Sequence, residues 1–134
     1  MKLDHERLAA YNEALQFAFA AHQLSRRLPK GEADMGDQLR RAATSVTLNL
    51  AEGAGEFAKR DKARFYRMSK RSLCECAAIL DLAKMIGGEG DYDAVRQNLE
   101  RVTGMLVGLI RACGVEGIDG TGASGPSEQP GDKG

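Results

Sequence analysis

Four polar residues at helical spacing are the first whose side chains could support chemistry. Arg41, Ser45, Asn49 and Glu52 stand at i, i+4, i+8 and i+11, so on a helix they form one face, here called the polar stripe. An active site is one interpretation, but acid–base catalysis needs a titratable pair that converges on a pocket, and an arginine keeps its proton. The favoured interpretation is structural: paired, half-buried polar groups that fix the register of two helices.

A facing helix would supply the partners of the polar stripe. If residues 34–57 and 61–87 form a helical hairpin that turns near position 58, the numbers of facing residues sum to about 117. The expected pairs are then Arg41 with Glu75, Ser45 with Ser72, and Glu52 with Arg64. These residues form the predicted structural polar network.

The window from position 59 to position 71 is strongly basic. It holds seven Lys or Arg residues and one Asp, whereas the whole chain has 19 basic and 19 acidic residues and no net charge. Four of the cations form one helical face, here called the basic stripe: Arg60, Arg64, Arg67 and Arg71. Tyr66 lies between them, an arrangement typical of a surface that contacts phosphates and stacks on a base. The alternative is a solvated face, or one that pairs with acidic neighbours.

The remaining reactive residues predict no metal site and no cofactor. His5 and His22 stand 17 residues apart, and no carboxylate or cysteine completes a metal-binding spacing around them. Gly53-Ala54-Gly55 lacks the strand and the Lys-Ser/Thr pair of a phosphate-binding loop. We therefore expect no catalytic residue and no small-molecule substrate.

The cysteines and the apolar runs bear on location. The odd number of cysteines, three, and the polar start of the chain predict reduced thiols and a cytoplasmic protein. No apolar run approaches the roughly 20 residues that a membrane-spanning helix needs.

Four segments with helical periodicity carry the polar stripe and the basic stripe. They span about 4–28, 34–57, 61–87 and 91–113, with Asp61 and Asp91 as candidate N-caps. The apolar seam of the second segment is Leu39, Ala43, Val46, Leu50 and Phe57. Short links favour antiparallel neighbours, so we expect an all-α, antiparallel up-down-up-down four-helix bundle over residues 1–113. Residues 114–134 hold seven Gly and two Pro, which predicts a disordered tail.

The first segment differs from the others because it has two apolar faces. One consists of Leu8, Tyr11, Leu15 and Ala18, and the other of Ala10, Ala14, Phe17, Ala21, Leu24 and Leu28. A four-helix bundle covers only one face of a helix, so the second predicts a subunit interface and hence a homo-oligomer. Tolerated surface exposure is the alternative.

The second and third segments resemble a known family. The run Arg-Arg-Ala-x-x-Ser-Val-x-x-Asn-Leu-Ala-Glu-Gly at positions 40–53, followed by Arg64-Phe65 and by positions 69–75, is similar to the four-helix-bundle proteins associated with 23S rRNA intervening sequences. The resemblance covers about residues 5–113 and implies a bundle that assembles into a ring, typically a homopentamer. Related members include the accessory variability determinant of diversity-generating retroelements, a basic pentamer implicated in binding RNA and a reverse transcriptase. The family has no established catalytic residues, so the resemblance implies none here.

Together, these patterns predict a non-enzymatic homo-oligomeric scaffold. It would contact RNA or a nucleic-acid enzyme through the basic stripe and Tyr66. The alternative is a purely structural protein–protein adaptor in which the same arginines pair with Glu52, Glu75 or a neighbouring subunit. Exposure of the guanidinium groups separates the two hypotheses, because buried ion pairs favour the adaptor and an open cationic surface favours nucleic acid.

Overall fold

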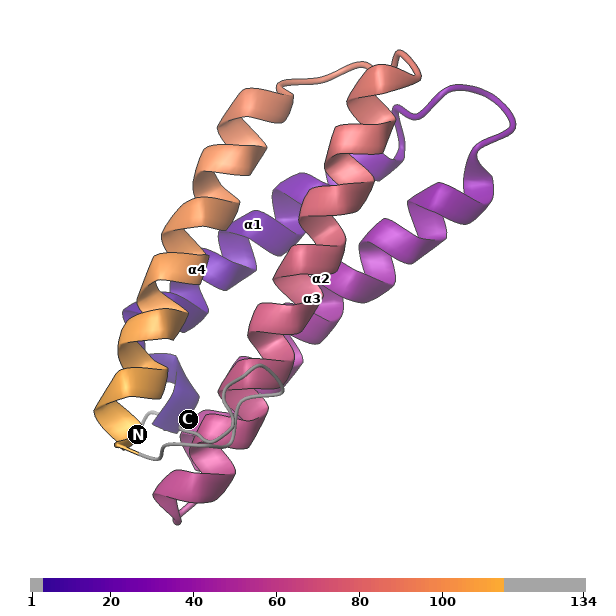
Figure 1. Ribbon diagram of the computed structural model, residues 1–134. Helices are drawn as coiled ribbons and strands as arrows, with labels where there is room; N and C mark the ends of the chain where they lie inside the picture. The colour runs from indigo at the N-terminus through magenta and orange to yellow at the C-terminus, as the bar shows by residue number, and fades with distance from the viewer. Residues whose placement is uncertain (1–3, 115–134) are drawn as a thin grey trace, which may run out of the picture.

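The computed structural model describes residues 4–114, and these fold into helices joined by short links (Figure 1). A short 3-10 helix, η1 (Asp4–Arg7), precedes the four long helices α1 (Ala9–Ser25), α2 (Ala33–Gly55), α3 (Lys59–Met85) and α4 (Tyr92–Cys113). Between residues 4 and 114 there is no strand, so the all-α prediction is confirmed. The predicted Gly-rich tail lies, apart from Gly114, outside the described residues.

The four helices surround one core. Consecutive helices pack against each other, and α1 also packs against α4, which closes the bundle. Neighbours in sequence run in opposite directions, as Figure 1 shows, so the up-down-up-down prediction is confirmed. Every helix contributes large, fully buried side chains to the core: Phe17 from α1, Leu39 and Leu50 from α2, Leu73 from α3, and Leu106 from α4.

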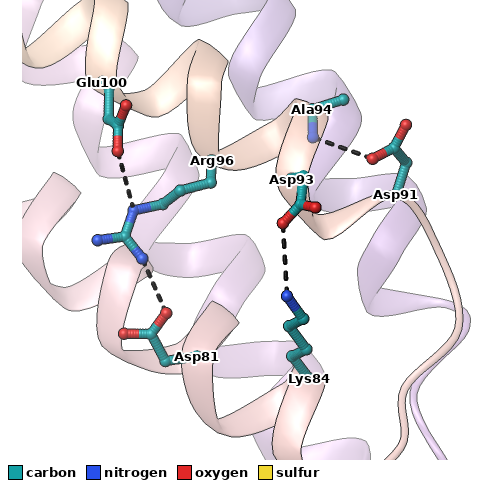
Figure 2. Close-up of polar contacts among 7 residues, drawn as sticks. All are labelled: Asp81, Lys84, Asp91, Asp93, Ala94, Arg96 and Glu100. Atoms are coloured by element: carbon teal, nitrogen blue, oxygen red, sulfur yellow. Dashed lines mark hydrogen bonds and ion pairs between the residues drawn. The ribbon is translucent and has the colours of Figure 1, made fainter.

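The helix ends follow the capping signals in part. The Asp91 carboxylate accepts a hydrogen bond from the Ala94 backbone N–H at 3.0 Å, so the predicted cap of α4 is confirmed (Figure 2). The prediction that Asp61 caps the third helix is wrong, because α3 begins two residues earlier at Lys59. Asp61 instead lies in the first turn, where a carboxylate interacts favourably with the helix dipole.

Exposed ion pairs join α3 to α4 (Figure 2). The Arg96 guanidinium of α4 lies 2.8 Å from the Asp81 carboxylate of α3, and Lys84 Nζ of α3 lies 3.4 Å from Asp93 of α4. Arg96 also lies 3.8 Å from Glu100 on its own helix. Such surface pairs contribute about 0–1 kcal/mol each, so the register of α3 on α4 is set mainly by the core. Within the described part of the chain, no helix combines the length and the apolar character needed to cross a membrane.

Candidate nucleic-acid interface

Hydroxyl groups hold α2 and α3 in the predicted register. Ser72 Oγ donates a hydrogen bond to Ser45 Oγ at 2.9 Å, and Asn49 Nδ2 donates to the same oxygen at 2.9 Å. Nearby, the buried Ser69 Oγ donates to the Val46 carbonyl oxygen at 2.7 Å. Buried hydroxyls need such partners to offset desolvation. The structure thus brings together Ser45, Asn49 and Ser72 of the predicted network.

The charged residues of the predicted network do not form ion pairs with one another. Arg41, Glu52 and Glu75 are exposed, and within residues 4–114 none of them forms an ion pair. The register predicts that Arg41 lies near Glu75 and Glu52 near Arg64, but neither of these two pairs forms an ion pair. These side chains stand on the outer edge of the hairpin, where water competes and an ion pair gains little. Arg64 instead lies 3.9 Å from Asp61 on its own helix.

The basic stripe lies on the outer face of the N-terminal half of α3. Arg60, Arg64 and Arg71 are exposed, and Arg67 is half-buried. The Arg64 guanidinium is 4.6 Å from the centroid of the Phe65 ring, a cation–π distance that restrains the side chain without removing it from water. Three of the four arginines of the stripe thus form an open cationic surface.

Tyr66 is not part of that surface. It is only 4% exposed, on the core face of α3 that it shares with Ala63 and Leu73. Burial, with a smaller contribution from Cys113, raises the pKa of its phenol. The prediction that Tyr66 stacks on a base is therefore wrong, because its ring packs inside the bundle next to Gly53. The spacing of Ala63, Tyr66 and Leu73, at i, i+3 and i+10, was the signal for this position.

Phe57 is exposed, although the sequence predicts that it is buried. The sequence predicts it in the apolar seam of the second segment, and the other members of that seam are fully buried, whereas Phe57 is 100% exposed. The reason is that α2 ends at Gly55, and Glu56 is extended with φ −76° and ψ 146°, so Phe57 belongs to the link before α3. The bundle therefore carries a fully exposed aromatic ring three residues before the first arginine of the basic stripe.

An open pocket of about 450 Å³ lies beside this link. It is lined by Asp4 and Leu8, by residues 54–57, and by Lys62 and Tyr66. Lys62 Nζ donates hydrogen bonds to the Gly53 and Ala54 carbonyl oxygens at 3.3 and 2.9 Å. The Lys62 ammonium thus provides hydrogen-bond donors for two carbonyl groups at the C-terminal end of α2. It is therefore not part of the open cationic surface.

The cysteine environments bear on nucleophilic chemistry. Cys76 is buried, and this burial, reinforced by the charge of Glu75, raises the pKa of its thiol to about 12. The thiol is protonated at neutral pH and is a poor nucleophile. Among the described residues no cluster of three or more His, Cys, Asp or Glu side chains is placed to hold a metal ion.

A second surface feature lies on α1 and α2. The inner face of α1 is buried in the core, whereas Leu15 and Phe19 are 45% and 66% exposed. Leu48 on α2 is 61% exposed. Arg40 Nη1 donates to Ser25 Oγ at 2.8 Å, a hydrogen bond that joins α1 to α2. Leu15, Phe19 and Leu48 are here called the outer apolar patch.

One comparison with known proteins shows the family of the chain, and another shows its fold. A family model described as 23S rRNA-intervening sequence protein matches residues 6–108. A crystal structure of a protein with unknown function, from the S23 ribosomal protein family of Bacteroides thetaiotaomicron VPI-5482, superimposes with a TM-score of 0.69 at 18% sequence identity, over 76% of this chain and 95% of that one. At this identity the structural likeness shows the fold alone. No curated protein is significantly similar to the chain.

Proposed function

Because the chain belongs to the 23S rRNA-intervening sequence protein family, we propose that it is a non-enzymatic, homo-oligomeric scaffold that binds RNA through the basic stripe of α3. The observation that carries the proposal is the exposure of Arg60, Arg64 and Arg71 in a chain without net charge. The stripe spans about 17 Å of helix, at roughly 1.5 Å for each residue. Arginine presents a planar set of N–H donors that suits phosphate oxygens. Glu75, one turn after Arg71, ends the stripe.

Reversing two charges of the stripe should weaken RNA binding. We expect Arg64→Glu with Arg71→Glu to lower the affinity for a mixed-sequence RNA at least tenfold, because fewer phosphates are then neutralised and fewer counterions are released on binding. The slope of log affinity against log salt should fall by about 0.7–0.9 for each phosphate that is no longer neutralised. Fluorescence anisotropy of a labelled RNA, titrated between about 50 and 200 mM salt, measures both quantities.

A control with the same change in net charge is available at the other end of the bundle. Arg26 and Lys30 are exposed where α1 ends and the link to α2 begins (Figure 1), so Arg26→Glu with Lys30→Glu should bind RNA with nearly unchanged affinity. An equal loss in the two double variants, or an affinity that ignores salt, would overturn the assignment of the interface to α3.

The outer apolar patch is the proposed subunit interface. Phe19→Asp and Leu48→Asp should each reduce the mass measured by light scattering from several chains, five being the number favoured by the resemblance, toward one. A carboxylate buried at such an interface loses its hydration without a partner. Leu82→Asp is the matched control, because Leu82 is an exposed leucine on α3, away from the patch. A wild-type monomer, or a response confined to Leu82→Asp, contradicts this interface.

A protein–protein adaptor is the second candidate function. It is favoured by two exposed apolar side chains, Leu82 and Met85, near the C-terminal end of α3. An assembly that forms normally and does not bind RNA at low salt would support it. For either function we place the protein in a reducing, cytoplasmic compartment, in keeping with three unpaired cysteines.

A further inference from the structure

The fully exposed Phe57 stands where the basic stripe begins. Single exposed apolar residues are common on protein surfaces, so exposure alone carries no function. The neighbours of Phe57 distinguish it: Lys59 and Arg60 follow two and three residues later, and Arg64 one turn further, and all three are exposed. The link therefore presents an aromatic face next to cations at the turn of the α2–α3 hairpin.

We propose that Phe57 stacks on an unpaired base and that the interface consequently takes a single-stranded nucleic acid and not a duplex. The proposal rests on the proposed function, since the basic stripe must first hold the backbone. Proteins that bind single strands combine a cationic track for phosphates with aromatic side chains on which bases stack. In a duplex each base is already stacked between its neighbours, so Phe57 finds no free face there.

The pocket beside Phe57 suits a base better than a phosphate. Among the residues that the structure describes, the charged lining is formed by Asp4, Glu56 and Lys62, whose ammonium already donates to two backbone carbonyl oxygens. The two carboxylates repel a phosphate, and the Lys62 ammonium is already occupied by its hydrogen bonds to the backbone. The carboxylates accept hydrogen bonds from the amino groups on base edges. A base on Phe57 would thus have its sugar–phosphate backbone toward Arg60 and Arg64 and its edge toward the pocket.

A tryptophan at position 57 reports stacking directly. The chain contains no tryptophan, so Phe57→Trp introduces a single fluorophore. We expect its emission to be quenched by a single-stranded RNA or DNA and left unchanged by a duplex of the same sequence at equal occupancy. Leu82→Trp, an exposed position near the other end of α3, is the control whose emission neither strand form should quench.

Two further variants distinguish aromatic stacking from the effect of apolar side-chain volume. Phe57→Ala and Phe57→Leu both remove the aromatic face and should lower the affinity for a single strand about 5- to 100-fold, a range typical of losing one stacked base. Duplex affinity should not change. Because Phe57 is fully exposed, both variants should unfold like the wild type, which a denaturant titration checks.

The outcomes distinguish this proposal from the proposed function. Retention of single-strand affinity in Phe57→Ala, alongside its loss in Arg64→Glu with Arg71→Glu, would overturn stacking and leave RNA binding by the stripe intact. Quenching of Phe57→Trp by the duplex as strongly as by the single strand would also overturn it. A wild-type protein that binds neither strand form at low salt would overturn both.

Discussion

Replacing Phe17 by Ala is expected to lower the free energy of unfolding by about 3–5 kcal/mol. Phe17 is fully buried, and its neighbours on the inner face of α1 are the small residues Ala10, Ala14 and Ala21. The residues next to this ring on the inner face of α1 are alanines, so they are too small to close the cavity that its removal would leave. Since domains of this size are stable by about 5–15 kcal/mol, urea unfolding followed by far-UV circular dichroism should show a strongly destabilised protein.

Phe19, two residues further along the same helix, is the matched control. It is mostly exposed, so Phe19→Ala should change the unfolding of the dissociated chain by no more than about 0.5 kcal/mol. Any larger effect should appear only as a dependence on protein concentration, because assembly stabilises the folded chain by mass action. Equal losses in the two variants, measured at low protein concentration, would contradict the assignment of Phe17 to the core and Phe19 to an interface.

Much of the bundle is specified by local signals in the sequence. The cap at Asp91 and the seam of Leu39, Ala43, Val46 and Leu50 were found where expected. The hairpin register also followed, since Ser45 and Ser72 meet as the spacing required. Helix periodicity determines which residues share a face, and short links leave few ways to arrange four helices.

The details of the interface depended on features that spacing does not determine. Whether Phe57 is in the core was decided by where α2 ends, and a shift of two residues there moves the ring from the seam into water. Tyr66 is different, because its spacing with Ala63 and Leu73 indicates the core face of α3, and its ring lies there. The charged pairs failed for another reason: on the surface, hydration competes with every ion pair, so proximity in register does not produce contact.

At Gly53, α2 packs closely against the Tyr66 ring of α3, and Gly53→Ala should destabilise the protein. A Cβ atom at this position would lie 2.6 and 2.8 Å from two ring carbons of Tyr66 and 3.2 Å from the Lys62 carbonyl oxygen. The Tyr66 ring is buried, so it can make room only by displacing its neighbours. We expect a loss of about 1–3 kcal/mol from overpacking, against a gain of about 1 kcal/mol from the better helix former. Thermal and urea unfolding at fixed protein concentration measure the balance.

Gly55, in the same last turn of α2, separates the steric effect from helix propensity. Nothing lies within 4 Å of a Cβ atom built there, so Gly55→Ala should stabilise the protein by a few tenths to about 1 kcal/mol. The double variant Gly53→Ala with Tyr66→Leu provides the decisive cycle, since a smaller side chain at position 66 makes room for the new methyl group. The destabilisation of the double variant should then be clearly smaller than the sum of the two single effects. Strict additivity would mean that the Tyr66 ring is not what excludes a side chain at position 53.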